Sequence, residues 1–328
     1  MNVLIIGAGI AGLAAADRLV EHGLGPDQIR MVDKSRGVGG RMASRRLTCE
    51  LGEARFDHGA QFFTSRSSEF AALVDAAVRD GAVTEWTRGF GAEPDGHPRW
   101  RGTDAMTALA KWLQHRAGVT PELGYRIDDL GRELAERPAT AVIHTAPVPQ
   151  ALATMAFCGL LPEPGLAHRL AQIQYQPTIT VLVVPNDAPD GLPPFGASQH
   201  HDDPEHPDLA FVADNQAKGI SEVPALTIHL SNATSELLWD EPDSVLLERA
   251  LAAAAHLLGP AANPDRIVAF QVQRWRYAGP VACWPEPTVL WGTDPIIALA
   301  GEAFDGPKVE GAFRSGRAAA DAIIRRGE

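Results

Sequence analysis

The spacing of apolar residues predicts a strand–helix–strand unit at the start of the chain. Residues 3–6 form a short, mostly β-branched apolar run, which is typical of a buried strand. Apolar residues then recur at helical spacing over residues 10–20, and a second strand is expected at residues 29–32. Two strands and a helix within about thirty residues form a βαβ unit, so we expect a parallel sheet here.

The remaining pattern predicts a β-rich middle and a second nucleotide-type unit at the end. Residues 187–207 are rich in proline, aspartate and histidine and are expected to form a loop. We expect helices at residues 69–78, 105–116 and 235–258, strands at 141–145, 178–184, 225–230 and 267–275, and aromatic-rich strands within 84–101. A strand at residues 296–300 and a helix at 311–325 then follow. This order predicts a discontinuous domain whose first and last segments meet in space.

Charge and cysteine content narrow the class of protein. The 328 residues carry 29 Lys and Arg against 41 Asp and Glu, a net charge of −12, which argues against nucleic-acid and anionic-membrane partners. One basic cluster nevertheless stands out, at Arg36, Arg41, Arg45 and Arg46. The three cysteines have no CxxC spacing, and no apolar run reaches eighteen residues. We therefore expect a cytoplasmic protein with no disulfide framework and no obligate protein partner.

A glycine triplet lies where a dinucleotide would bind. Gly7, Gly9 and Gly12 separate the first strand from the first helix, so that Gly7 permits the turn, Gly9 the approach of a pyrophosphate and Gly12 close packing. Asp33 ends the second strand at the distance expected of a ribose-binding carboxylate. Ile10, Ala11 and Lys34 flank these positions and are included in the predicted cofactor site.

Two further motifs favour FAD over a nicotinamide cofactor. The Gly39-Gly40-Arg41 sequence gives a second glycine doublet, and Asp57, His58, Gly59, Ala60, Gln61 and Phe62 follow as a polar stretch between aromatics. A β-bulge with incidental polar residues is the plainer interpretation of that stretch. Together the motifs resemble the FAD-dependent amine oxidase superfamily, and the Asp-x-Gly-Ala-Gln-aromatic form resembles its renalase-like members.

The C-terminal part carries the rest of the resemblance. Gly301, Glu302, Val309, Gly311 and Ala312 are similar to the superfamily's C-terminal FAD motif. Residues 299–316 contain no cysteine, whereas members with a covalent flavin use one there, so the FAD is expected to be non-covalent. Trp275 and Tyr277 resemble a renalase-type Trp-Arg-Tyr segment. They and His229 are candidate substrate contacts together with Gln61, although buried aromatic residues and histidines are more often part of a core.

The resemblance implies a fold, a domain division and an activity. The expected fold is α/β (α+β overall), with a discontinuous Rossmann-like FAD-binding domain at residues 1–75, 107–160 and 286–328. A β-rich substrate domain of the amine-oxidase type would take residues 76–106 and 161–285. The implied activity is oxidation of 2- or 6-dihydro isomers of NAD(P)H to NAD(P)+, with O2 reduced to H2O2. An oxidase of small amines and a non-catalytic flavin-binding protein are the alternatives.

Two other kinds of site are not favoured. His200, His201, Asp202, Asp203, Glu205, His206 and Asp208 have the composition of a metal site. Because they lie in a proline-rich loop without regular ligand spacing, we interpret them as an exposed acidic loop and predict no metal. Ser65, Ser67 and Ser68 lack the glycine-flanked elbow of a serine hydrolase.

Overall fold

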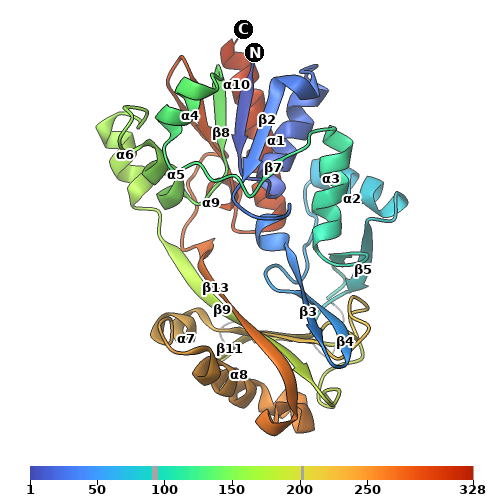
Figure 1. Cartoon of the computed structure of the whole chain (residues 1–328). Helices are drawn as coiled ribbons and strands as arrows, with labels where there is room; N and C mark the ends of the chain where they lie inside the picture. Colours follow the sequence, from blue (N-terminus) through green and yellow to red (C-terminus); the bar gives the residue numbers. More distant parts are fainter. Residues whose placement is uncertain (91–94, 201–202, 328) are drawn as a thin grey trace.

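The computed structural model describes residues 1–90, 95–200 and 203–327. Two sheets dominate these residues, and the long strands β9 and β13 run from the region of one into the other (Figure 1). The two chain termini lie together at the end of the molecule far from the second sheet (Figure 1). The α/β class and the Rossmann-like domain predicted from the sequence are confirmed.

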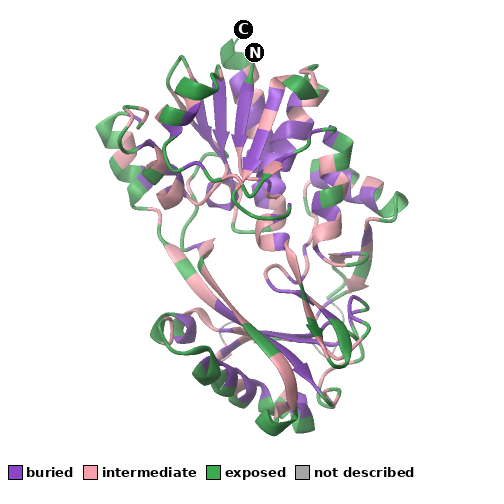
Figure 2. Ribbon diagram, in the orientation of Figure 1, coloured by how far each residue is buried: buried purple, intermediate pink, exposed green. Residues whose placement is uncertain are grey.

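The first sheet is six-stranded and takes strands from both ends of the chain. Its order is β14-β15-β8-β1-β2-β7, with all neighbours parallel except β14 and β15. The strands are β1 (Val3–Ile6), β2 (Ile29–Asp33), β7 (Glu122–Leu123), β8 (Ala141–His144), β14 (Val289–Trp291) and β15 (Ile296–Leu299). Its central strands are buried beneath helices on both faces (Figure 2), which explains their unbroken apolar runs. The domain is therefore discontinuous, as predicted.

Ten α-helices occur in the described part of the chain. They are α1 (Ile10–Glu21), α2 (Ser68–Arg79), α3 (Thr107–Ala117), α4 (Leu130–Glu136), α5 (Val148–Met155), α6 (Pro164–Ala171), α7 (Asn232–Leu237), α8 (Asp243–Leu258), α9 (Glu302–Asp305) and α10 (Val309–Gly327). The first and last of the long helices of the nucleotide-binding domain, α1 and α10, pack directly against each other. A methyl group on Gly316 of α10 would lie only 2.0 Å from the carbonyl oxygen of Ala11, so the two helices cross where neither has a side chain in the way.

The second sheet is five-stranded and antiparallel, in the order β10-β11-β12-β9-β13. Its strands are β9 (Tyr175–Pro185), β10 (Ala197–Gln199), β11 (Leu209–Asp214), β12 (Leu226–Leu230) and β13 (Ile267–Pro280). Helix α8 covers one face by burying Leu246, Ala250 and Leu251 against strand residues such as Ile228. The stretch Asp243–Ala262 is long and apolar enough to cross a membrane, by length and composition only. Its packing on the sheet accounts for that composition.

Two short hairpins lie in the chain between β2 and β7. They are β3 (Ser44–Cys49) with β4 (Gly52–Asp57), and β5 (Val83–Thr87) with β6 (Arg99–Gly102). The second confirms the aromatic strands expected around residues 84–101, of which 91–94 lie outside the described residues. The first hairpin was not predicted, because its outward charged residues hide the alternation of strand β3.

Two predicted segments were wrong in detail. The single helix expected at 235–258 is divided into α7 and α8, because Ser231 caps a helix that begins at Asn232 and Pro242 precedes the next. The loop expected at 187–207 contains the short strand β10, whose Gln199 pairs with Phe211 of β11. Of that segment, His201 and Asp202 lie outside the described residues.

The crossing of α1 and α10 predicts that a glycine-to-alanine change in a helix destabilises the protein, against the usual trend. Replacing a mid-helix glycine by alanine normally stabilises a helix by about 1 kcal/mol. Here Gly316→Ala should instead lower the free energy of unfolding, because the new methyl group meets the Ala11 carbonyl oxygen at 2.0 Å. Urea unfolding of the variant, with the exposed helical change Arg325→Ala as control, measures the difference. A stabilised Gly316→Ala variant would contradict the tight crossing.

Candidate functional site

A large cleft lies along the carboxyl ends of the parallel strands. Its volume is about 1660 Å³, and Ile6, Asp33 and His144 at the strand ends line it. That edge of an open parallel sheet is where ligands bind in such folds. Since a drug-sized ligand fills at most roughly 1000 Å³, this cleft has room for a dinucleotide and a second molecule.

The three glycines of the first loop differ in what surrounds them. Gly7 has φ +109°, a left-handed value that favours glycine, and a Cβ on Gly12 would lie 1.9 Å from the Gly7 carbonyl oxygen. A Cβ on Gly9 would meet no protein atom within 4 Å, yet Gly9 lines the cleft and precedes the first turn of α1. Packing therefore requires glycine at positions 7 and 12, whereas position 9 leaves bare backbone facing a ligand.

The second glycine loop is joined to the first by backbone contacts. The Gly39 N–H donates to the Ala8 carbonyl at 2.9 Å, and Gly9 and Gly39 form an isolated β-bridge. The Asp33 carboxylate accepts the N–H groups of Ala8 and Ser35, each at 2.7 Å, and lines the cleft. The two loops thus form one rigid rim, which fits the double clasp expected for FAD.

An ion pair connects this rim to the C-terminal motif. Arg41 holds the Glu302 carboxylate with both guanidinium Nη atoms, the Nη1–Oε1 distance being 2.6 Å. Arg41 also donates to the backbone carbonyl of Tyr277 at 3.0 Å. Both charged groups line the cleft, and the pair therefore fixes three distant segments around it.

The start of α10 faces the same space. Val309, Glu310 and Ala312 line the cleft. The N-terminus of this long helix carries a partial positive charge, so negative charge on a bound group beside it is stabilised. The Glu310 carboxylate accepts the N–H groups of Arg66 and Ser67, which ties the helix to the loop before α2.

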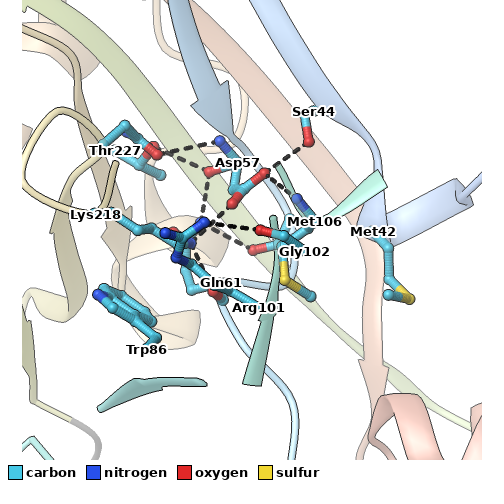
Figure 3. Close-up of polar contacts among 12 residues, drawn as sticks. Met42, Ser44, Asp57, Gln61, Trp86, Arg101, Gly102, Met106, Lys218 and Thr227 are labelled. Carbon is cyan, nitrogen blue, oxygen red and sulfur yellow. Dashed lines mark hydrogen bonds and ion pairs between the residues drawn. The ribbon is translucent and has the colours of Figure 1, made fainter. Parts of the chain in front are cut away.

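A network of polar contacts behind the cleft lining is centred on the buried carboxylate of Asp57 (Figure 3). Asp57 is fully buried and accepts hydrogen bonds from Ser44 Oγ at 2.6 Å and from the Met106 N–H at 2.8 Å through one oxygen. Its other oxygen contacts Lys218 Nζ at 2.8 Å. Both side chains have no exposed surface, so each charge depends on the other for compensation.

Lys218 also contacts Gln61 and fixes its position. Its ammonium donates to the Gln61 carbonyl oxygen at 2.6 Å and lies 3.4 Å from Gln61 Oε1, with Trp86 4.4 Å away across its ring face (Figure 3). Gln61 Nε2 in turn lies 2.5 Å from the Asp57 carbonyl oxygen and 3.2 Å from His229 Nε2. Burial lowers the pKa of Lys218 despite the Asp57 charge. Gln61 is thereby held in one orientation.

Aromatic and imidazole groups also line the cleft. Trp275 donates its indole N–H to the His58 carbonyl at 2.9 Å, and its ring lies 5.2 Å from the His58 ring. Burial lowers the pKa of His58 to about 4 and that of His229 to about 3. Both imidazoles are therefore neutral at pH 7. The ring of Tyr277 packs edge-on against Tyr175 at 5.3 Å.

Most of the residues predicted from the sequence meet in this cleft, and four do not. Those that line it are Gly7, Gly9, Ile10, Ala11, Asp33, Lys34, Gly40, Arg41, His58, Gly59, Ala60, Gln61, Phe62, His229, Trp275, Tyr277, Glu302, Val309 and Ala312. Gly12, Asp57, Gly301 and Gly311 lie outside the lining. Asp57 turns into the Lys218 network, and a Cβ on Gly311 would lie 2.4 Å from the Gly306 carbonyl oxygen. Gly301 donates its N–H to Ser315 Oγ at 2.8 Å. These four shape the backbone behind the site.

Sequence reasoning missed Lys218 and gave Arg45 no role. Lys218 follows an Asp-Asn-Gln turn, and a lysine in such a polar turn is normally exposed. Arg45 belonged to a noted basic cluster, but only the β3–β4 hairpin turns it into the cleft. A prediction of that hairpin would have identified Arg45.

The cleft fits an FAD molecule. Bare backbone at Gly9 and the start of α1 suit the pyrophosphate, Asp33 suits the ribose, and the α10 N-terminus suits a ring that becomes negatively charged. Cys49, Cys158 and Cys283 all lie outside the lining, in keeping with the expected non-covalent attachment.

The Lys218–Asp57 pair gives a stability prediction. Lys218→Met leaves the Asp57 charge buried without its partner, and should lower the free energy of unfolding by about 3–5 kcal/mol. The double variant Lys218→Met/Asp57→Asn should recover part of that loss, because no isolated charge remains. Urea unfolding measures both, with the exposed-lysine change Lys111→Met as control. Equal stabilities of Lys218→Met and the wild type would show that the pair contributes nothing.

Comparison with known proteins identifies the family. An NAD(P)-binding Rossmann-like domain matches residues 5–77, and the flavin containing amine oxidoreductase family matches residues 124–324. A solved structure of reduced UDP-galactopyranose mutase is similar over 99% of this chain and 94% of its own, with a TM-score of 0.69 and 13% identity. The match to cyclohexylamine oxidase from Brevibacterium oxydans IH-35A covers 99% of this chain and 98% of that one, with a TM-score of 0.66 and 14% identity.

A wild-type putrescine oxidase bound to putrescine gives a TM-score of 0.57 at 15% identity, covering 99% of both chains. At these identities the solved structures establish the shared fold. The family match spans more than half of the chain and reaches from the residue after β7 into α10. The prediction of FAD as cofactor is confirmed by this match, and the chain belongs to the flavin containing amine oxidoreductase family.

Proposed function

We propose that this flavoprotein oxidises 2- or 6-dihydro isomers of NAD(P)H to NAD(P)+. The observation that carries the proposal is an arginine in the cleft without an acidic partner. Arg45 on β3 lines the cleft, and among the described residues no carboxylate lies within ion-pair distance of it. Its only side-chain hydrogen bond there is to Gln273 Oε1, at 2.9 Å. An uncompensated cation of this kind favours an anionic ligand.

The neighbours of Arg45 increase this preference. Burial and the nearby charge of Arg36 lower the pKa of Arg45, so the two guanidinium groups repel each other until an anion lies between or beside them. By contrast, Arg46 and Arg55 of the same hairpin both contact Glu53. Arg45 is thus the hairpin's available phosphate ligand, and guanidinium is well suited to phosphate.

The charge of the whole cleft supports the same class of substrate. Lys and Arg outnumber Asp and Glu eleven to five in its lining, although the chain carries −12 overall. FAD brings two phosphate groups, and a dinucleotide substrate brings at least two more. A small amine is a cation, so this lining would repel it.

The aromatic and imidazole part of the lining suits a flat ring bearing a carboxamide. Trp275 supplies an aromatic face, and the neutral His229 and the fixed Gln61 supply hydrogen-bonding groups. With pKa values of about 3 and about 4, His229 and His58 are poor bases at neutral pH. A dihydropyridine needs no general base, because loss of hydride makes its ring aromatic.

The chain's own residues would therefore position the dinucleotide substrate and disfavour an amine. When bound, FAD would supply the two-electron acceptor for the substrate's hydride, and O2 would take up that electron pair with one further proton as H2O2. Arg45 would hold a substrate phosphate, while Trp275, Gln61 and His229 set the height and rotation of the nicotinamide ring. Placement of the hydridic carbon decides the rate, since hydride transfer tolerates little misplacement.

The substrate prediction is tested by anaerobic stopped-flow bleaching of the flavin. A 2- or 6-dihydro isomer of NADH should reduce the flavin rapidly and with saturation, whereas ordinary 4-dihydro NADH should react slowly. Cyclohexylamine and putrescine should leave the flavin oxidised. Rapid, saturable reduction by either amine would assign the chain to the amine-oxidase alternative, and no reduction by any compound would favour a non-catalytic flavin protein.

The role of Arg45 is tested separately from the chemistry. Arg45→Gln should raise the Kd for the reactive isomer about 10- to 100-fold, the effect of losing one charge-assisted hydrogen bond to phosphate. The limiting rate of flavin reduction should change far less than the Kd, since Arg45 would hold a substrate phosphate and not the ring that gives up the hydride. The control is Arg132→Gln, which removes the same charge from the exposed face of α4. An unchanged Kd for Arg45→Gln would remove the phosphate contact from the proposal.

A further inference from the structure

Three histidines from distant parts of the chain converge on the substrate domain. His200 and His206 lie in the segment between β10 and β11, and His256 lies in the last turn of α8. One ring nitrogen from each lies within 4.8 Å of those from the other two. None of the three lines the flavin cleft. The loop considered alone gave no regular ligand spacing, and the third imidazole comes from a helix about fifty residues further on in the sequence.

The three imidazole rings pack directly against one another. His206 and His256 stack with centroids 3.7 Å apart and planes within 4°, and His200 is edge-on to both, with centroid distances of 5.0 and 5.6 Å. A tetrahedral zinc with bonds of about 2.0–2.1 Å needs its ligand nitrogens about 3.3 Å apart. The nitrogens therefore have to approach one another by up to about 1.5 Å. The stacked His206 and His256 rings also have to turn out of their parallel planes, because a bound metal lies in the plane of each imidazole.

One ligand is already oriented by a carboxylate. His200 Nδ1 lies 2.9 Å from Asp203 Oδ2, so the ring's other nitrogen, Nε2, is left for a metal. Histidine ligands commonly donate their second N–H to a carboxylate in this way, which fixes the tautomer and strengthens the ligand. The Ser198 hydroxyl now lies 2.8 Å from Nε2 and would turn aside.

The cluster is accessible and has space for a further ligand. His206, His256 and Glu205 line a hollow of about 350 Å³ beside α8. Asp208 also lines it, but its carboxylate is engaged by Arg249 at 2.5 Å and by Thr234 Oγ1 at 2.7 Å. Water or Glu205 would complete a four-coordinate site.

We propose that His200, His206 and His256 bind Zn²⁺ or a similar first-row divalent cation. Three imidazoles are the ligand set that such ions prefer. The ion would link the segment after β10 to the end of α8, and so fix the edge of the second sheet. Because β10 ends at Gln199, which lines the flavin cleft, the site would also stabilise that part of the cleft wall. It takes no part in the flavin chemistry.

The test uses the flavin-loaded protein without a histidine tag, after dialysis against a chelator. Calorimetric titration with Zn²⁺ should show one saturable equivalent, and Co²⁺ should give ligand-field bands beyond the absorption of oxidised flavin. Saturating Zn²⁺ should also raise Tm, because the ion binds the folded state. Absence of saturable binding of both cations would overturn the proposal.

Matched variants locate the site. His256→Ala changes an exposed position of α8 and should weaken Zn²⁺ binding by about 100-fold or more, while removing the rise in Tm. His115→Ala, an exposed histidine in the last turn of α3, is the control and should behave as the wild type. His206→Ala should show the same loss of Zn²⁺ affinity and of the rise in Tm. One equivalent bound with unchanged affinity by His256→Ala would place the metal elsewhere and refute the assignment.

Discussion

The burial of the Asp57 carboxylate is the constraint on which the cleft depends. A charge without exposed surface is tolerated only where it is paired and fully hydrogen-bonded. Ser44, Met106 and Lys218 meet that requirement, and they come from the first hairpin, the start of the segment leading to α3 and the second sheet. The nucleotide-binding part and the substrate part therefore cannot shift relative to each other without exposing an unpaired charge. The same network fixes the position of Gln61.

A second ion pair fixes the flavin side in a comparable way. Arg41 and Glu302 join the second glycine loop to the C-terminal motif, and the Arg41 carbonyl accepts the N–H of Ala60 at 2.8 Å. The segment 57–61 is thus held at both ends by Lys218, which contacts Asp57 and Gln61, and between them by Arg41, which contacts Ala60. The two anchors are coupled through only a few residues of backbone. A disturbance of either is expected to move the flavin contacts and the substrate contacts together.

The sequence identified those parts of the site that local backbone geometry defines. The glycine loop and Asp33 could be predicted because strand, turn and helix follow each other within one βαβ unit. Lys218 could not, since nothing near residue 218 indicates that its ammonium is buried 161 positions away from its carboxylate in sequence. Gly301 and Gly311 were placed in the site by analogy of motif, whereas their contacts show that they support the backbone behind it. Long-range pairing, unlike turn chemistry, leaves no local pattern.

The contrast between an acidic chain and a basic cleft has a consequence for selectivity. A net charge of −12 repels anions in bulk solution, and the eleven basic residues of the lining act mainly at short range because salt screens charges beyond roughly 8–10 Å. An anionic dinucleotide is therefore favoured only once it enters the cleft, where Arg45 lacks a carboxylate among the described residues. In the proposed reaction charge would select the nucleotide portion of the substrate, but every NAD(P)H isomer carries the same phosphates. Discrimination between isomers must then come from the nicotinamide end, where the rigid Gln61, His229 and Trp275 leave little freedom for the ring to slide. Affinity and positional selectivity would thus be set by different groups at opposite ends of one ligand.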